Sequence, residues 1–245
     1  MSLRQYQVKR QFQRTPEPTG SIGSGEGPLR FVVQKHHASR LHYDFRLEAD
    51  GTLKSWAVPK GPPANPADKR LAVMVEDHPL DYRTFEGVIP KGNYGAGTVM
   101  VWDEGTYHSP GSTDRGQSEH AVLDGLQKGS FHVVLHGKKL RGEYILVKTK
   151  QSENSWLLFK KGVATDAEQP SDEPDRSVIS GRTMEEITRG APSREGSNAV
   201  AGIDLSDAPK GPMPRNIEPM LATPVAEPFD DPEWLFEVKW DQAVL

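Results

Sequence analysis

The chain has no cysteine among its 245 residues. Disulfide bonds and thiolate metal sites are therefore excluded, and a metal ion could be held only by histidine, aspartate or glutamate. Those ligands favour manganese, iron, zinc or magnesium chemistry. The absence of thiols also fits residence in the cytoplasm, where disulfides are rare.

Long apolar runs are missing as well. No stretch approaches the roughly 20 apolar residues of a membrane-spanning helix, and the polar residues 1–14 lack the apolar core of a signal peptide. Hydrophobic residues make up 35% of the chain, which suits one modest globular core with extensions. We therefore expect a soluble intracellular protein that does not contact a membrane.

Charge is unevenly distributed along the chain. Residues 1–163 carry 23 Lys and Arg against 17 Asp and Glu, a balance of +6, whereas residues 164–245 carry 7 against 17, a balance of −10. A basic body with an acidic tail is compatible with a polyanionic partner such as nucleic acid. An excess of this size is also common on surfaces that bind no nucleic acid, so by itself it is weak evidence.

Composition divides the chain into four regions. We expect a basic N-terminal arm with little regular structure at residues 1–28, a folded domain at 29–163, an acidic flexible linker at 164–213, and a return to folded-domain composition at 214–245.

The folded region contains many short apolar or alternating segments between turns. Strands are expected at residues 41–58 (a hairpin that turns at Asp50-Gly51), 70–76, 97–102, 130–136, 142–148 and 155–160, and a short helix at 121–126. Many short strands with few helices predict an all-β barrel or sandwich.

Residues 41–48 alternate strictly between apolar and polar side chains. This is the period of a strand with one buried face, so His42, Asp44 and Arg46 share the opposite face. Residues two apart on one face lie roughly 7 Å apart, which lets His42 and Asp44 bind one metal ion. The simpler alternative is an ordinary surface strand, which a lone histidine would favour.

His36 is a further histidine just upstream. On a straight strand it would lie about 20 Å from His42. Its participation requires the chain to fold back within residues 37–40, and we predict that fold-back. We give no role to the other five histidines, because none lies in a comparable polar cluster: His37, His108, His120, His132 and His136.

Cationic side chains near this strand indicate a reaction on a phosphate ester. Arg46, Lys60, Arg70 and His78, the last at the end of a predicted strand, suit a phosphate ester whose charge they could hold beside a metal. Lys60 and Arg70 taken singly are more often solvated. The glycine-rich residues 92–97 are interpreted as a tight turn, because no Lys-Ser/Thr or helix follows as in a phosphate loop.

Two other functions remain open on these residues. Two histidines and one carboxylate are also the ligand set of non-haem Fe(II) oxygenases, and dependence on 2-oxoglutarate would favour that function. A noncatalytic nucleic-acid-binding barrel could use the same side chains to contact phosphates. Binding of nucleic acid without a metal ion and without cleavage would favour this noncatalytic function.

Six segments together form a specific set: 34–36, 41–48, 56–62, 77–82, 86–90 and 94–99. They resemble the 3′-phosphoesterase module of prokaryotic DNA ligase D over roughly residues 5–163. The resemblance implies a compact β-barrel and a manganese-dependent enzyme that trims 3′ ends at DNA breaks. It would remove a 3′-terminal ribonucleoside and then the 3′-phosphate, leaving a 3′-OH for sealing.

The resemblance also implies roles for individual residues. The ligands of a Mn²⁺ ion would be His36, His42 and Asp44. The scissile phosphate would be surrounded by His78, Arg46 and Tyr82. Further phosphate contacts would come from Lys60, Arg70, Arg10 and Glu17.

Arg10 and Glu17 belong to the N-terminal arm, so we expect the arm to be ordered against the site at least in part. The chain departs from the family at Gln11, where aspartate is usual, so the retention of both trimming steps is an open question. The substrate would be the 3′ end of a DNA or DNA–RNA primer-template. A separate ligase, polymerase or Ku-type end-binding protein would act alongside, in the cytoplasm at the nucleoid.

Residues 237–241 resemble the start of an ATP-dependent DNA ligase domain, with Lys239 in the place of its nucleophile. Gln242 replaces the glycine of that motif, and the sequence ends at Leu245. A ligase needs a whole nucleotidyltransferase fold around its lysine. We therefore expect residues 214–245 to be a truncated start of a ligase-like domain, poorly ordered and without ligase activity.

Overall fold

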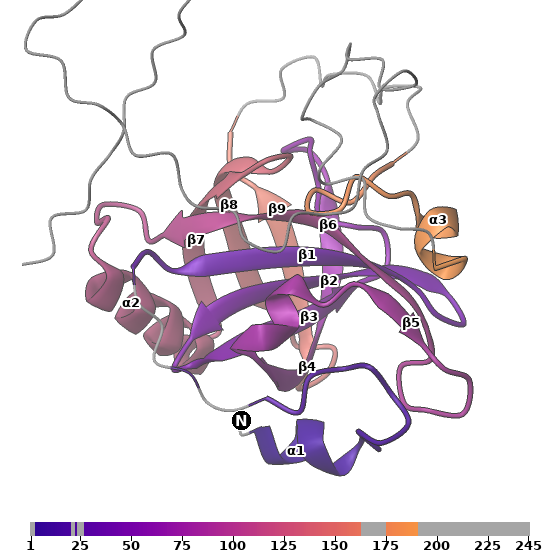
Figure 1. Cartoon of the computed structure of the whole chain (residues 1–245). Coiled ribbons are helices and arrows are strands. Elements are labelled where there is room, and N and C mark those ends of the chain that lie inside the picture. The colour runs from indigo at the N-terminus through magenta and orange to yellow at the C-terminus, as the bar shows by residue number, and fades with distance from the viewer. Residues whose placement is uncertain (1–2, 21–22, 24–26, 163–174, 191–245) are drawn as a thin grey trace, which may run out of the picture. The chain divides into compact units, whose positions relative to one another are not determined.

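The computed structural model describes residues 3–20, 23, 27–162 and 175–190 (Figure 1). Its elements in chain order are α1 (Leu3–Val8), β1 (Arg30–His37), β2 (Leu41–Ala49), β3 (Thr52–Val58), β4 (Lys69–Pro79), the 3₁₀ helix η1 (Leu80–Thr84), β5 (Gly87–Ile89), β6 (Gly97–His108), α2 (Arg115–Lys128), β7 (Ser130–Gly137), β8 (Arg141–Lys148), β9 (Ser155–Lys160) and α3 (Met184–Thr188).

Eight of the strands close into an antiparallel barrel. Their order is β1-β2-β3-β4-β9-β8-β7-β6, and β6 pairs back with β1, while β5 is added to β6 outside the ring. Closure leaves no long unpaired edge in the barrel wall. The prediction of a mainly β barrel with few short helices is confirmed. No helix in the described part of the chain is long and apolar enough to span a membrane.

The expected strands correspond to β2, β3, β4 and β6 to β9, and the expected short helix to α2. The sequence pattern did not predict β1 or β5. Helix α2 is longer than expected because Asp114 accepts a hydrogen bond from the backbone N–H of Gln117 at its start. Gly129, at φ 83°, ends it in the left-handed conformation that favours glycine.

The barrel interior is filled by apolar side chains from opposite walls. Phe31, Phe45 and Trp56 from one wall meet Tyr144 and Trp156 from the other, all at most 1% exposed. Because strand residues alternate between faces, the residues between them point to the outer face of the wall. On β2 those outer residues are the polar ones that the alternation predicted.

Part of this outer face is covered by a second, smaller apolar cluster. Tyr6 of α1 packs there with Tyr82, Phe85 and Ile89 and with Val99 of β6. Figure 1 shows α1 alongside β4, and the two elements are in contact. The polar face of the barrel wall is therefore buried beneath the N-terminal arm and residues 80–97.

The arm differs from the expected irregular segment, because residues 3–8 form helix α1. A six-residue helix is not stable by itself. Its stability comes from burial of Leu3 and Tyr6 against the barrel, a tertiary contact that the local sequence does not encode.

Residues 175–190, which we call the strap, lie within the region expected to be a flexible linker. Met184 and Ile187 of α3 pack on Met100 and the partly buried Trp102 of β6. Asp175 pairs with Lys35 at 2.9 Å. These sixteen residues are a packed addition to the barrel rather than linker, and Met184–Thr188 form helix α3.

The other residues of the expected linker, 164–174 and 191–213, and the ligase-like residues 214–245 with Lys239 lie outside the described part of the chain.

Candidate active site

The β1–β2 hairpin brings together the histidines that the sequence separates. Its register pairs His36 with His42, and the chain turns between β1 and β2 within residues 38–40. The two imidazole centroids lie 4.8 Å apart. The predicted fold-back is confirmed, and it places His36 opposite His42 on the face that also carries Asp44.

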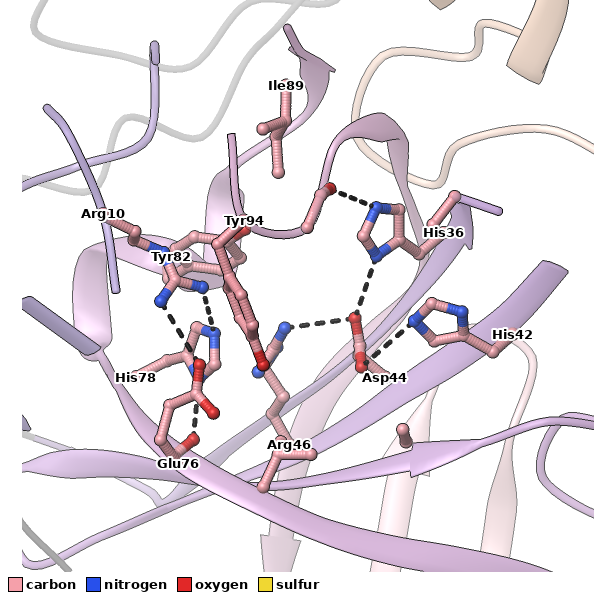
Figure 2. Close-up of a pocket in the computed structure, with 14 residues that line it drawn as sticks. Arg10, His36, His42, Asp44, Arg46, Glu76, His78, Tyr82, Ile89 and Tyr94 are labelled. Atoms are coloured by element: carbon pink, nitrogen blue, oxygen red, sulfur yellow. Dashed lines mark hydrogen bonds and ion pairs between the residues drawn. The ribbon is translucent and has the colours of Figure 1, made fainter. Parts of the chain in front are cut away.

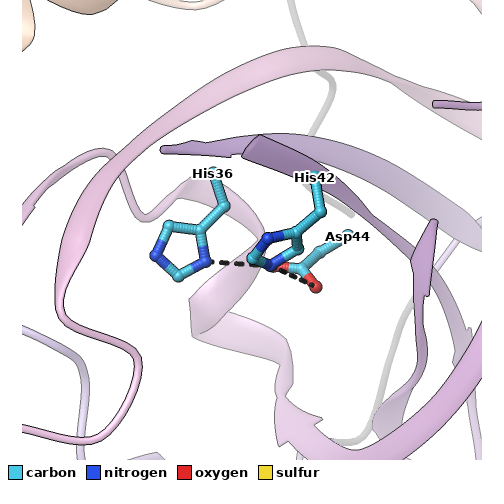
Figure 3. A group of neighbouring side chains, drawn as sticks. All are labelled: His36, His42 and Asp44. Carbon is cyan, nitrogen blue, oxygen red and sulfur yellow. Dashed lines mark ion pairs between the residues drawn. The ribbon is translucent and has the colours of Figure 1, made fainter. Parts of the chain in front are cut away.

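Backbone carbonyls fix the tautomer of both rings. His36 Nε2 donates to the Gly95 carbonyl at 2.9 Å, and His42 Nδ1 donates to the Arg40 carbonyl at 3.0 Å. Because a carbonyl oxygen can only accept, the other nitrogen of each ring is the one that can offer a lone pair to a metal ion. His36 Nδ1 lies 3.7 Å and His42 Nε2 3.8 Å from the Asp44 carboxylate (Figure 3).

These three side chains have the chemistry of a divalent-cation site. One ligand atom from each of His36, His42 and Asp44 lies within 4.8 Å of the other two. Neutral imidazoles and a carboxylate bind manganese, iron and zinc. Metal-binding histidines usually donate their other N–H to a carbonyl or carboxylate, as both do here. The residues present therefore fit such an ion with three protein ligands.

Asp44 is buried and remains ionised. Burial raises the pKa of its carboxyl, but the positive charge of Arg46 and the contacts with His36 and His42 outweigh burial and hold that pKa well below its usual range. Arg46 Nη2 lies 3.2 Å from Asp44 Oδ2. A negatively charged carboxylate therefore lies beside both imidazoles.

Arg46 is held on three sides. Besides its contact with Asp44, it donates to Gln34 Oε1 and to Ser55 Oγ, both at 2.8 Å. The amide of Gln34 donates in turn to the carbonyls of Tyr82 and Phe85, at 3.0 and 2.9 Å. Sequence reasoning missed Gln34 as a site residue, although its position two residues before His36 places it on the same strand face.

The cluster forms one side of a cavity of about 240 Å³. Figure 2 shows the opposite side, which is built by Arg10, Glu76, His78 and Tyr82. His78 Nδ1 donates to the Glu76 carbonyl at 2.9 Å. Its Nε2 lies 3.1 Å from Arg10 Nη2 and accepts from that group.

His78 is consequently neutral. Burial lowers the pKa of its imidazole well below the usual range, and the positive charges of Arg46 and Arg10 act in the same direction. Glu76, which sequence reasoning also missed, balances part of this charge. Its carboxylate lies 3.3 Å from Arg10 Nη1 and 2.9 Å from Lys9 Nζ.

The arm enters the site through Arg10. Its guanidinium lies 3.9 Å from the centre of the Tyr6 ring and donates through Nε to Glu17 Oε1 at 2.7 Å. The Tyr82 hydroxyl donates to the same carboxylate oxygen at 2.9 Å. Burial and the nearby Glu17 charge raise the pKa of Tyr82 well above its usual value, so its hydroxyl stays protonated.

Seven of the ten side chains implied by the resemblance line the cavity: Arg10, His36, His42, Asp44, Arg46, His78 and Tyr82. Glu17 lies behind it and orients Arg10 and Tyr82. Lys60 and Arg70 line a different hollow together with Lys69. Arg70 pairs there with Asp68 at 2.6 Å.

The separation has a simple cause. Arg70 and His78 lie eight residues apart on β4, which corresponds to about 26 Å of extended strand.

The arm residue Gln11 is exposed and accepts a hydrogen bond from Arg14 at 3.2 Å.

Comparison with known proteins identifies the family. Residues 34–148 match the family model described as the DNA Ligase D 3′-phosphoesterase domain. Residues 34–148 belong to this domain family. The match runs from Gln34, within β1, to the end of β8, so it includes His36, His42 and Asp44.

Relatives extend the similarity over nearly the whole chain. The chain is 46% identical, over 98% of its length, to the multifunctional non-homologous end joining protein LigD of Pseudomonas aeruginosa. It is 37% identical, again over 98%, to the multifunctional non-homologous end joining DNA repair protein LigD of Mycobacterium tuberculosis. The chain covers 28% and 25% of these two proteins, so it spans about a quarter of their length.

Proposed function

We propose that this chain is a metal-dependent 3′-phosphoesterase that trims 3′-ribonucleotide and 3′-phosphate ends of DNA for end-joining repair, with Mn²⁺ as its metal. The observation that carries this proposal is one cavity with a three-ligand cluster on one side and the cations Arg46 and Arg10 around it. Membership of the phosphoesterase family favours this function over an Fe(II) oxygenase or a noncatalytic binding barrel.

A divalent ion held by His36, His42 and Asp44 would polarise a phosphate oxygen and lower the pKa of a bound water. Arg46 cannot leave its position, because Gln34 and Ser55 hold it, so its charge is oriented before the substrate arrives. Fixed charge of this kind costs little reorganisation during the reaction.

Arg10 and His78 would act as a pair. When Arg10 turns toward a phosphate, it releases Nε2 of His78, whose ring stays anchored through Nδ1. The negative charge of the phosphate raises the pKa of that imidazole. Nε2 can then carry the proton that the leaving oxygen requires.

The remaining residues receive roles outside the cavity. Glu17 positions Arg10 and Tyr82. Lys60 and Arg70 would contact DNA phosphates beyond the cavity, in the hollow that they share. A separate ligase, polymerase or Ku-type partner and a location at the nucleoid stay predictions, and we expect no ligase activity from Lys239.

A cleavage assay tests the function. A primer-template with a 3′-terminal ribonucleotide is incubated with Mn²⁺ and the wild type, His42→Ala or His136→Ala, the last an exposed histidine of β7 outside the cavity. We expect the wild type and His136→Ala to form a 3′-phosphate and then a 3′-OH. His42→Ala should be at least about 100-fold slower, because several kcal/mol of metal assistance is lost.

Unchanged substrate with the wild type would contradict the phosphoesterase function. Wild-type rates with His42→Ala would contradict the metal site and leave the function standing.

A further inference from the structure

Tyr94 differs from the other aromatic side chains of the domain. It is the only Phe, Tyr or Trp in the described residues that is exposed, with 48% of its surface accessible. A single exposed aromatic is ordinary on a protein surface. This one, however, lines the cavity that contains His36, Asp44 and Arg10.

The loop that carries Tyr94 is tied to the metal-type cluster. It connects β5 with β6, and the carbonyl of the next residue, Gly95, accepts the hydrogen bond from His36. Asn93 of the same loop donates to the Arg14 carbonyl of the arm at 3.3 Å. The ring is thus held at a defined place relative to the ligands.

Two cations of the arm hold the ring itself. Lys9 Nζ lies 4.8 Å and the Arg10 guanidinium 5.6 Å from its centre, and Lys9 also reaches the Tyr94 hydroxyl at 3.4 Å. In the view of Figure 2 the ring lies between the Arg10–His78 side of the cavity and Asp44. The position is therefore built by several contacts, although the ring is half exposed.

The dimensions of the cavity suggest what the ring meets. About 240 Å³ is below the roughly 300–1,000 Å³ of ordinary small-molecule sites. Such a space takes a phosphate and sugar, and it leaves the attached base at the mouth. Bases stack on exposed aromatic rings without regard to sequence, because every base has a π-face.

We propose that Tyr94 is the platform on which the 3′-terminal nucleoside of the substrate stacks. This inference rests on the proposed function and makes it more specific. The terminal nucleoside leaves in the first trimming step and is absent in the second. Tyr94 should therefore promote removal of a nucleoside and have no part in removal of a 3′-phosphate.

Three substrates separate stacking from other roles: a primer-template ending in a ribonucleotide, the same end with a ribose that lacks its base, and a 3′-phosphate end. The full chain is compared with Tyr94→Ala, Tyr94→Phe and Tyr94→Trp. Val88→Ala is the control, since Val88 is an exposed apolar residue of nearby β5 that does not line the cavity.

We expect Tyr94→Ala to raise KM for the ribonucleotide end about tenfold, the effect of losing one base–aromatic stack. The base-free and 3′-phosphate ends should be cleaved as by the wild type. Tyr94→Phe, Tyr94→Trp and Val88→Ala should keep the wild-type KM for the ribonucleotide end within a factor of about three.

Two results would overturn the inference. If Tyr94→Ala cleaved all three ends less efficiently by the same factor, the residue would only support the loop and His36. An unchanged KM for the ribonucleotide end would show that no base stacks there. Failure of the proposed function has a different signature, because the wild type itself would then leave all three ends intact.

Discussion

Asp44 shows how single residues make this site. Its carboxylate lies within 4 Å of two imidazoles and one guanidinium, and the guanidinium is the only permanent positive charge of the three. Arg46 keeps Asp44 ionised, and the fixed tautomers keep both histidine lone pairs available. A lysine in place of Arg46 would keep the charge but could not reproduce the fork of donors that reaches Asp44, Gln34 and Ser55.

His78 predicts a pH dependence of stability. Its pKa is lowered by burial in the folded state, whereas in the unfolded chain it is about 6.5. Above pH 6.5 the ring is neutral in both states, so the stability is fully present. As the pH falls below 6.5, the unfolded state takes up a proton that the folded state does not, and stability is lost by up to about 1.4 kcal/mol per pH unit from this group.

Urea unfolding of the metal-free protein between pH 7.5 and 5 measures this loss. Other titrating groups of the protein also contribute, so the informative quantity is the difference in slope between the wild type and His78→Asn. We expect a shallower slope for His78→Asn, in which an amide replaces the titrating ring. Identical slopes would contradict a neutral buried His78.

At the scale of elements, the sequence predicted those strand features that depend on the local alternation of polar and apolar residues. The alternation of residues 41–48 correctly predicted the core face of β2 from Tyr43 onward and the polar face opposite it, whereas Leu41 at the start of the strand is 46% exposed. The fold-back before Leu41 followed from the need to bring His36 to His42. The role of His36 itself came only from the family resemblance, because spacing alone placed it about 20 Å away.

Elements that depend on tertiary contacts were not predictable in this way. Helix α1 is stabilised by burial of Tyr6, and Glu76 is recognisable as a site residue only once the arm lies over β4. Lys60 and Arg70 were grouped with His78 by charge. The length of β4 separates Arg70 from His78, which charge patterning does not reveal.

The strap gives a prediction at this scale. Ile187→Ala removes a buried side chain from α3 and should cost about 3 kcal/mol of local stability. Because the strap does not line the cavity, cleavage should stay within a factor of about two of the wild-type rate. Hydrogen exchange of residues 175–190 is the measurement.

Glu185→Ala, an exposed change on the same helix, is the matched control and should leave exchange nearly unchanged. Slow exchange in Ile187→Ala would mean that the strap is not held by its apolar contacts.

At the scale of the whole molecule, the site lies on the outside of the barrel wall rather than in its interior. The interior is filled by aromatic and aliphatic side chains, so the barrel is a rigid support. The polar face of β1 and β2 becomes a cavity because the arm and residues 80–97 cover it. The pattern of many short strands predicted a barrel or a sandwich. The pairing of β6 with β1, which decides between them, joins segments too distant in sequence to be predicted from that pattern.

The central claim is that His36, His42 and Asp44 hold the ion on which hydrolysis depends. The most direct test is to titrate metal-free protein with Mn²⁺ and to measure the rate at which it cleaves a 3′-ribonucleotide end. We predict no cleavage in the presence of a chelator, a rate that rises to a plateau at one ion per chain, and no such rise for His36→Ala. Full cleavage by the chelated wild type, or the same titration curve for His36→Ala, would contradict the claim.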